Sequence, residues 1–250
     1  MDANLTPVIL VVGGSSGIGQ AVARNFSTQN ARVIVAARDQ SRLEESAAGL
    51  SCESVTLDAT DSAATEAAIQ SIAKTHGRLD GVVNCAGSIL LKPAHLIADE
   101  EFLQTINANL LTAFNVLRAS ARLMMKQSGG GSIVLCSSVA ARRGLVNHEA
   151  IAAAKAGVEG LALAAAATYA RYSVRVNCVA PGLTRTEMSR PLTQNENVAK
   201  ISAALHPLGR IGEPADVASA ICWLLSPGQT WVTGQVIGVD GGLSSIQARG

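Results

Sequence analysis

The sequence has no excess of charge of either sign, since its 20 lysines and arginines nearly balance its 19 aspartates and glutamates. With a net charge of +1 and no basic stripe, it does not suggest nucleic acid or an anionic membrane as a partner. No uninterrupted apolar run approaches the roughly 18 residues of a membrane span. The short apolar stretch near the N-terminus follows no basic region, so it is typical of a first strand rather than of a signal peptide. We therefore expect a soluble, cytoplasmic protein.

Closely spaced cysteine pairs are also missing. The five cysteines, Cys52, Cys85, Cys136, Cys178 and Cys222, are scattered along the chain without a C-x-x-C pair. Such a set is typical of reduced core thiols rather than of a disulfide framework or a metal site, and we expect no metal. Aromatic residues make up only 3%, whereas apolar residues reach 48%, which favours an ordered core with helices packed closely over a sheet.

Short β-branched runs alternate with longer helical patterns along the chain. Buried strands are predicted at Val8–Val12, Arg32–Ala36, Ser54–Leu57, Gly81–Asn84, Ser132–Cys136, Val174–Val179 and Gln235–Val239. Helices are predicted at residues 17–29, 40–49, 61–75, 100–127, 150–171 and 214–225. The alternation predicts one α/β domain over residues 1–250, a Rossmann-type doubly wound parallel sheet with helices on both faces. Residues 183–210 show few periodic signals, and we expect them to cover a substrate as a mobile segment.

A glycine-rich turn follows the first predicted strand and opens a helix. Glycines let the backbone turn tightly and approach a pyrophosphate, which then lies over free N–H groups at the helix N-terminus. In this context the turn predicts a dinucleotide site rather than a plain tight turn. The residues of that site are Gly13, Ser15, Ser16, Gly17, Ile18 and Gly19.

The end of the second predicted strand bears on the choice of dinucleotide. An acid there, about 20 residues after the glycines, would bind the ribose 2′-hydroxyl and select NAD. Here the small Ala37 is followed by Arg38, whose guanidinium can pair with a 2′-phosphate. Arg38 could instead be a solvated loop residue, and Asp39 could reach a ribose. We favour NADP(H) over NAD(H).

Further motifs follow in an order that resembles the short-chain dehydrogenase/reductase family over nearly the whole chain. Val12 stands where the family has threonine before the glycines, and Cys85 replaces the second asparagine of its N-N-A-G motif. The matching residues are Gly13, Gly17, Gly19, Asp58, Asn84, Ala86, Gly87, Asn109, Ser138, Asn177, Pro181, Gly182 and Thr186, with the segments Pro207–Ala218 and Val232–Gly242. The resemblance implies a nicotinamide-dependent oxidoreductase that acts on a small carbonyl compound or a secondary alcohol.

The same resemblance implies the rest of the cofactor site. In it, Asp58 contacts the adenine, while Thr186 and the backbone near Thr184 bind the nicotinamide carboxamide. The implied cofactor-binding set also contains Ala59, Asn84, Ala86, Gly87, Lys155, Pro181 and Gly182. The resemblance further implies a homo-oligomer, most often a tetramer, and the small apolar helix at Ala150–Ala170 suits such an interface.

The family's active site consists of asparagine, serine, tyrosine and lysine, of which three can be placed here. The resemblance implies that Ser138 bonds the substrate oxygen, and that Lys155 holds the nicotinamide ribose and lowers the pKa of the tyrosine. It implies that Asn109 kinks its helix and holds a water in a proton relay. Each residue has a simpler alternative, in which Ser138 caps a strand end, Asn109 is a helix irregularity and Lys155 is a surface lysine.

The tyrosine itself is absent. In the family it lies thirteen residues after the serine and four before the lysine, and both spacings lead to Ile151, which cannot donate a proton. Tyr169 and Tyr172 lie at the far end of the same predicted helix, and Tyr169 is about 27 Å from Ile151 along its axis. Neither tyrosine can substitute within its own subunit.

Three explanations stay open for the missing donor. His148, or more weakly Glu149, could donate the proton, although each could also be a solvent-facing loop residue. The protein could instead bind the dinucleotide without turnover, as a sensor or partner subunit, or it could transfer hydride slowly without an acid. Arg142 and Arg143 could anchor an acidic substrate group or simply cover a loop surface. The sequence leaves open whether the protein is an active enzyme, and which substrate it takes.

Overall fold

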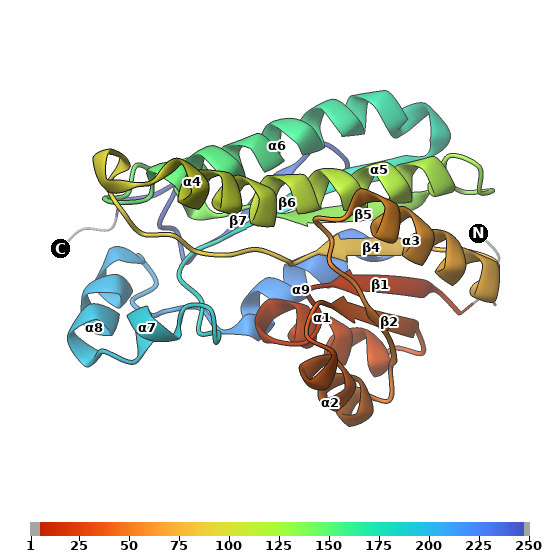
Figure 1. Cartoon of the computed structure of the whole chain (residues 1–250), viewed down its shortest axis with the longest axis horizontal. Helices are drawn as coiled ribbons and strands as arrows, with labels where there is room; N and C mark the ends of the chain where they lie inside the picture. The colour runs from red at the N-terminus through yellow and green to blue at the C-terminus, as the bar shows by residue number, and fades with distance from the viewer. Residues whose placement is uncertain (1–5, 248–250) are drawn as a thin grey trace.

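Seven strands form one sheet in the computed structural model, which describes residues 6–247 (Figure 1). The strands are β1 (Val8–Val12), β2 (Arg32–Ala37), β3 (Glu53–Thr56), β4 (Gly81–Asn84), β5 (Gly131–Cys136), β6 (Val174–Pro181) and β7 (Val236–Val239). Their order is β3-β2-β1-β4-β5-β6-β7, and neighbouring strands run parallel. The predicted parallel sheet is confirmed, and each strand begins and ends within two residues of its predicted bounds.

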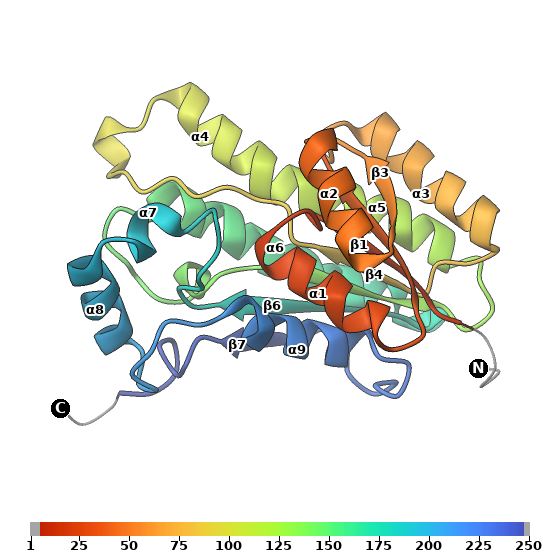
Figure 2. The same ribbon diagram turned by 90° about the horizontal axis from the view of Figure 1, so that it is seen from below.

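Helices cover both faces of the sheet, as predicted. One face carries α3 (Ser62–His76), α5 (Thr112–Met124) and α6 (Glu149–Tyr169), and the other carries α1 (Gly17–Ser27), α2 (Gln40–Leu50) and α9 (Pro214–Leu225). Figures 1 and 2 show these two layers on opposite sides of the strands. The further elements are α4 (Asp99–Ile106), α7 (Arg190–Thr193), α8 (Glu196–Leu205), the π-helical turn η2 (Asn107–Leu111) and the 3₁₀ turns η1 (Ala94–Leu96), η3 (Val139–Ala141) and η4 (Ala170–Tyr172).

The central strands explain why the sequence shows continuous apolar runs. In β1, Leu10 packs into the core beneath α3, α5 and α6, whereas its neighbours Ile9 and Val11 pack into the core beneath α1, α2 and α9. Side chains alternate between the two faces of a strand, so a strand covered on both faces must be apolar at every position. Two separate cores therefore hold the helix layers to one sheet.

Two predicted segments differ from the structure. The predicted helix 100–127 is divided, because α4 passes through the π-helical turn η2 into α5, which ends at Met124. Residues 183–210, expected to lack regular structure, contain α7 and α8. The apolar pattern that would predict α8 is weak because every residue of this helix keeps some exposure to solvent.

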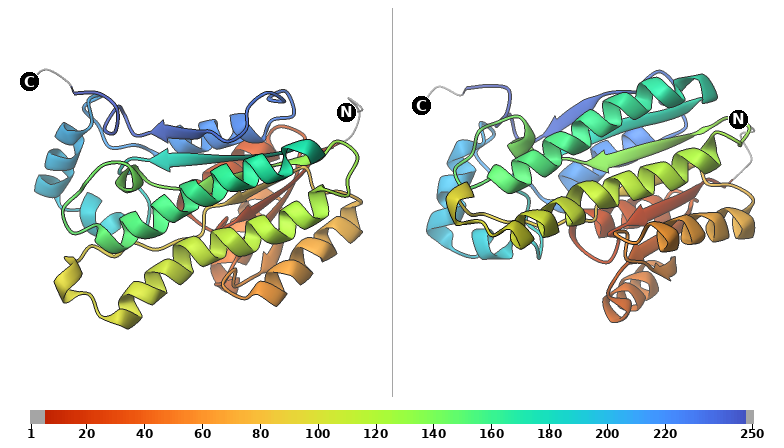
Figure 3. Two further views of the ribbon diagram at one scale, coloured as in Figure 1. Left: turned by 90° about the horizontal axis from the view of Figure 1, so that it is seen from above. Right: turned by 45° about the horizontal axis from the view of Figure 1, so that its top comes forward.

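The segment Glu149–Tyr172, which contains α6, is long and apolar enough to cross a membrane by length and composition alone. Core helices of soluble proteins pass the same test. Here Val158, Ala162 and Ala165 pack into the core beneath the helix, and Figure 3 shows α6 lying along β6. The helix therefore forms part of the layered fold.

The strand order locates the crevice of the sheet. The chain runs outward from β1 through β2 to β3, and then returns to β4 on the other side of β1. In open α/β sheets, ligands bind outside the carboxyl ends of the strands at this point of reversal. The loops after β1, β4, β5 and β6 all lie at that end, as do α7 and α8 (Figure 1).

Candidate active site

The glycine-rich turn between β1 and α1 lies in the crevice and requires its glycines. Gly13 has φ +78°, and a Cβ there would lie 2.7 Å from the Ala86 nitrogen in the loop after β4. A Cβ on Gly19 would overlap the Gly13 carbonyl oxygen. Any larger residue would thus push apart the turn, the helix and the neighbouring loop.

The start of α1 offers hydrogen-bond donors to a ligand. Within the described chain, Ser16 occupies the N-cap position without a side-chain hydrogen bond to the helix. The first amides of an α-helix have no partner inside the helix, and they carry the positive end of its dipole. Since no side chain caps them, the turn can accept a phosphate or pyrophosphate group, and the dinucleotide site stays a prediction. Ser15 and Ile18 belong to the same turn and first helical turn.

At the end of β2, the Asp39 carboxylate already has a hydrogen-bond partner. Its carboxylate accepts a hydrogen bond from the Arg42 amide at 3.1 Å and so caps α2. Arg38 is exposed beside it, and Ala37 occupies the strand end. The Arg42 guanidinium lies 3.6 Å from Asp39 and 2.8 Å from Glu187. Two guanidinium groups therefore border this part of the crevice.

The loop after β3 holds Asp58 in a defined conformation. One carboxylate oxygen accepts hydrogen bonds from the amide and hydroxyl of Thr60, at 2.9 and 2.7 Å. These hydrogen bonds hold the pKa of Asp58 below its usual value. The buried Asn115 amide donates to the carbonyls of Ala59 and Thr60, and so ties this loop to α5.

The loop after β4 brings three site residues together. Asn84 is buried and accepts a hydrogen bond from the Ala86 amide at 3.2 Å. A Cβ on Gly87 would lie 2.6 Å from Asn109 Oδ1 and 3.5 Å from Lys155 Nζ. Glycine at position 87 therefore lets the asparagine and the lysine approach the same backbone segment.

Asn109 lies in the π-helical turn between α4 and α5. Its amide donates to the Thr105 carbonyl at 2.9 Å and to the Ser88 hydroxyl at 3.2 Å, while its Oδ1 accepts from the Ser88 amide. The side chain thus joins the widened helical turn to the loop after β4. The predicted irregularity of this helix is present, and the proposed water relay stays a prediction.

Lys155 is only 8% exposed, so the alternative of a surface lysine is wrong. Its Nζ donates to the Cys136 carbonyl at 2.8 Å, at the carboxyl end of β5. Burial lowers the pKa of Lys155, because desolvation penalises the ammonium form. A buried ammonium at the end of a sheet is costly unless polar or anionic groups surround it.

The two serines after β5 have different partners. Ser138 Oγ accepts a hydrogen bond from the Ala140 amide at 3.2 Å and caps the turn η3, while its hydroxyl hydrogen is left to donate elsewhere. Ser137 is buried and donates to Glu159 at 2.8 Å. Glu159 also accepts from Arg142 at 2.7 Å. Capping by Ser138 matches the simpler alternative, but it does not prevent contact with a substrate oxygen.

Ile151 lies on α6 one turn before Lys155, and its side chain is 4% exposed. His148 occupies the N-cap position of α6, with Nδ1 2.7 Å from the Val146 carbonyl. Glu149 accepts a hydrogen bond from the Ala94 amide at 3.4 Å. Residues 148, 151 and 155 share one face of the helix, since they are separated by about one helical turn each.

Arg142 and Arg143, the candidates for anchoring an acidic substrate group, both have partners within the chain. Arg142 pairs with Glu159, and Arg143 donates to the Leu243 carbonyl. Tyr169 and Tyr172 pack against the core at the far end of α6. Among the residues that the structure describes, no cluster of three histidines, cysteines or acids could hold a metal ion.

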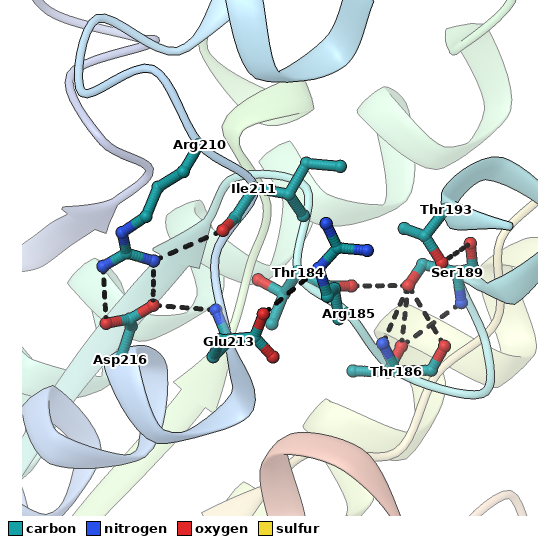
Figure 4. A network of polar contacts seen from close by, with 9 residues as sticks. All are labelled: Thr184, Arg185, Thr186, Ser189, Thr193, Arg210, Ile211, Glu213 and Asp216. Carbon is teal, nitrogen blue, oxygen red and sulfur yellow. Dashed lines mark hydrogen bonds and ion pairs between the residues drawn. The ribbon is translucent and has the colours of Figure 1, made fainter. Parts of the chain in front are cut away.

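A polar network ties the segment after β6 to the residues that precede α9 (Figure 4). Thr184 pairs with Gly212 as an isolated parallel bridge, and the Ser189 hydroxyl bonds both Thr184 and Thr186. Arg210 forms two hydrogen bonds to Asp216, at 2.6 and 2.9 Å, and these lower the pKa of Asp216 to about 2.

The same segment approaches α1 and α8. Thr186 Cγ2 would lie 3.1 Å from a Cβ on Gly17, so the threonine borders the pyrophosphate turn. At the end of β6, a Cβ on Gly182 would lie 2.7 Å from His206 Nε2, which accepts a hydrogen bond from the Leu183 amide. Pro181 ends the strand. The candidate carboxamide-binding segment is therefore rigidly supported from both sides.

Sequence reasoning missed several residues of this region. Arg42 and Glu187 meet although 145 positions separate them, and no sequence signal predicts that contact. Glu159 lies four residues after Lys155 on α6, a spacing that places both on one helix face and could have identified it. Cys85 and Cys136 end neighbouring strands, and their sulfur atoms are 3.6 Å apart.

The chain is similar to known proteins over nearly its whole length. A protein-family model described as Enoyl-(Acyl carrier protein) reductase matches residues 12–244. The 3-oxoacyl-(acyl-carrier-protein) reductase of Thermotoga maritima is 37% identical over 243 residues, which are 94% of this chain and 97% of that protein.

Two solved structures share the architecture. A short-chain type dehydrogenase/reductase from Mycobacterium ulcerans has a TM-score of 0.92 and 34% identity, covering 98% of this chain and 93% of that one. A variant of actinorhodin polyketide ketoreductase, solved with NADPH, has a TM-score of 0.90 and 30% identity, covering 96% of this chain and 98% of that one.

Proposed function

The chain belongs to the short-chain dehydrogenase/reductase family, and from this we propose an NADP(H)-dependent oxidoreductase acting on a carbonyl group or secondary alcohol of a small molecule. When bound, the cofactor would supply or accept the hydride at its nicotinamide ring. The observation that carries the proposal is Lys155, buried at the carboxyl end of the sheet beside Gly87 and Asn109. An ammonium held there suits a ligand rich in hydroxyl and phosphate groups.

The end of β2 supports NADP(H) rather than NAD(H). Asp39, beside the strand end, accepts a hydrogen bond from the Arg42 amide as the cap of α2, so part of its carboxylate is already engaged. Arg38 and Arg42 can pair with a 2′-phosphate, to which guanidinium groups bind strongly. One solved relative was itself described with NADPH.

We assign the other parts of the cofactor to the loops at the carboxyl edge of the sheet. The proposed contacts are Gly13, Ser15, Ser16, Gly17, Ile18 and Gly19 for the pyrophosphate, Asp58 and Ala59 for the adenine, and Asn84, Ala86, Gly87, Lys155, Pro181, Gly182, Thr184 and Thr186 for the nicotinamide half. Residues 183–210 would cover the substrate. Ser138 would donate its free hydroxyl hydrogen to the substrate oxygen, and Asn109 would hold the π-helical turn in place.

We propose His148 as the group that replaces the missing tyrosine. It lies about 4.5 Å along the helix axis from Ile151, on the face that carries Lys155. The hydrogen bond from Nδ1–H to the Val146 carbonyl leaves Nε2 free to carry the transferred proton.

The test measures NADPH oxidation against a panel of ketones and aldehydes. We expect His148→Ala to lower kcat by roughly 10²-fold, the contribution of a positioned acid, while His95→Ala, in an exposed loop, leaves it unchanged. Ile151→Tyr should restore the rate of His148→Ala. Cofactor binding without turnover, with activity only in Ile151→Tyr, would instead indicate a non-catalytic dinucleotide-binding protein.

We further propose a cytoplasmic homo-oligomer, most simply a tetramer. On the outer surface of α4, α5 and α6, Leu103, Phe114 and Leu163 are 57%, 41% and 63% exposed. Apolar patches of this kind mark protein interfaces. All five cysteines are free, which fits a reducing compartment. Light scattering at micromolar concentration that gave the monomer mass of 25.6 kDa would overturn the oligomer.

A further inference from the structure

Two cysteines meet at the floor of the crevice. Cys136 is the last residue of β5, and Cys85 directly follows β4. The two strands are parallel neighbours in which Asn84 pairs with Leu135, so the next pair along the register is Cys85 and Cys136. Their sulfur atoms share a hydrogen bond at 3.6 Å. Little movement would bring them to bonding distance.

Their side chains lie on the face of the sheet that carries the glycine-rich turn. Both pack beside the core formed with α1, α2 and α9, to which Val83 and Val134 contribute from two positions earlier on each strand. Cys85 also lies in the loop whose backbone approaches the Gly13 position to 2.8 Å. Both residues keep partial exposure beside the crevice.

The surroundings make the two thiols unequal. The hydrogen bond between the two sulfur atoms and the charge of Lys155 lower the pKa of Cys136, while the pKa of Cys85 is raised. The other cysteines are less reactive, since burial raises the pKa of Cys52 and Cys178, and that of Cys222 to about 12. Cys136 is thus the nucleophile of the pair, and Cys85 is placed to attack the oxidised Cys136 sulfur.

We propose that Cys85 and Cys136 form a reversible disulfide when a hydroperoxide enters the crevice, and that this disulfide weakens dinucleotide binding. The Cys136 thiolate attacks one peroxide oxygen, the O–O bond breaks, and a sulfenic acid forms as hydroxide leaves. The Cys85 sulfur then attacks the Cys136 sulfur, the S–O bond breaks, and water leaves. In total, two thiols lose two electrons and two protons, and hydrogen peroxide becomes two waters.

The effect on binding follows from the geometry. A disulfide has its sulfur atoms about 2.05 Å apart, so the two side chains must turn toward each other and shift the residues that carry them. Ala86 and Gly87 follow Cys85 directly, and the Cys136 carbonyl holds Lys155. The oxidised form therefore displaces the backbone and the ammonium that we assign to the nicotinamide half. This second effect rests on the proposed function, whereas disulfide formation does not.

The first experiment tests the bond itself. The reduced full chain is treated with hydrogen peroxide, and free thiols, intact mass and peptide links are measured. We expect two of the five thiols to disappear, the mass to fall by two hydrogens, and the peptides of Cys85 and Cys136 to be joined. A reductant should restore all five thiols. Retention of all thiols, oxygen addition at single cysteines, or a link between other cysteines would overturn the proposal.

Variants sharpen this result. Cys52→Ser should still lose two thiols, whereas Cys85→Ser and Cys136→Ser should form no internal disulfide. In Cys85→Ser, Cys136 should gain oxygen, since its sulfenic acid has no resolving thiol. The peptide map of the unaltered chain decides the question even if a variant fails to fold.

The second experiment titrates NADPH by fluorescence into reduced and oxidised protein. We expect roughly tenfold weaker binding after oxidation, as for the loss of one or two hydrogen bonds, and recovery on reduction. Bound NADPH should also slow oxidation. A disulfide without any change in affinity would refute the switch. If reduced protein binds no dinucleotide while the disulfide still forms, the proposed function fails and the redox pair stands.

Discussion

The two halves of the crevice are built in different ways. The half formed by β1, α1 and the loop after β4 depends on the backbone, with glycines at contact distance and an uncapped helix start. The half formed by η3, the start of α6 and the segment after β6 depends on side chains. Ser138 and Lys155 are present there, but position 151 carries an isoleucine. The first half thus keeps its glycines and its helix start, with Val12 and Cys85 as its departures from the family pattern, and the second half lacks the tyrosine.

This difference has a physical reason. A backbone site needs many residues to hold one shape, and each glycine in it is required by several neighbours. A side-chain site depends on a few functional groups, any of which can change without disturbing the fold, since Ile151 simply becomes buried. On the proposed function, binding and catalysis are therefore separable, and the four predictions below test the separation.

The largest effect is expected from Gly19→Ala. The added Cβ would overlap the Gly13 carbonyl oxygen, so the turn and helix must separate and the pyrophosphate site is lost. We expect NADPH affinity to fall by more than about 100-fold, equivalent to roughly 3 kcal/mol. Fluorescence titration measures it. Gly49→Ala, with no described atom within 4 Å of its Cβ, is the control and should bind normally. Near-normal binding by Gly19→Ala would show that the turn does not hold the cofactor.

The next effect concerns Lys155→Met, which removes the ammonium and nearly keeps the volume. We expect kcat/KM to fall by roughly 10²-fold, since the charge no longer acts on the reacting groups.

The same substitution should also change how the stability of the fold depends on pH. Burial lowers the pKa of Lys155, so the folded state binds fewer protons than the unfolded state as the pH rises toward the ordinary lysine value. Folding is therefore stabilised by rising pH in the unaltered chain.

Urea unfolding between about pH 7 and pH 10 measures this linkage. Lys155→Met should lose the rise, and Lys74→Met, on the exposed part of α3, should keep it. Equal pH dependence in Lys155→Met and the unaltered chain would show that Lys155 is solvated in solution.

Much of the fold could be predicted from the sequence because apolar periodicity follows burial directly. Strands buried on both faces, such as β1, appear as unbroken apolar runs. α8 escaped prediction because it buries none of its residues fully, although Asn195 caps it with bonds to Asn197 and Val198. The π-helical form of the turn at Asn109 escaped as well, since the family resemblance implied only a kink there and the side-chain bonds to Thr105 and Ser88 needed coordinates.

In the candidate site, too, some features could be predicted from the sequence and others could not. The glycine-rich turn and the positions of Ser138 and Lys155 follow from local motifs. Contacts between distant segments do not, and the pairs Arg42–Glu187 and Cys85–Cys136 depend on how loops meet in three dimensions. The occupation of Asp39 as a helix cap also needed coordinates, because the sequence left its role as a ribose ligand open.

A moderate effect is expected from Arg38→Ala, and it should distinguish the two dinucleotides. A charge-assisted contact with a 2′-phosphate is worth about 1.5–3 kcal/mol, so NADPH affinity should fall at least tenfold. NADH affinity should stay the same, because NADH has no 2′-phosphate. Arg32→Ala, at the other end of β2, is the matched control and should change neither affinity. A parallel loss for both dinucleotides would mean that Arg38 supports the loop rather than the phosphate.

The smallest effect is expected from Glu187→Gln, which removes an ion pair between the covering segment, residues 183–210, and the adenosine end of the crevice. Glu187 lies 2.8 Å from Arg42, and both side chains are more than half exposed. Exposed ion pairs contribute about 0.2–1 kcal/mol, so the fold should be unaffected. Yet the carboxylate neutralises Arg42 and would repel a 2′-phosphate beside it. Removing its charge should therefore strengthen NADPH binding roughly twofold and leave NADH binding unchanged.

Salt provides the decisive control for this last variant. Screening weakens interactions between exposed charges, so the gain should disappear at about 1 M salt, where the Debye length is about 3 Å. Glu44→Gln, which alters an exposed carboxylate elsewhere on α2, should show no gain. An equal increase for NADH would mean that Glu187 acts by holding the covering segment closed, and the two halves of the crevice would then be mechanically coupled rather than separable.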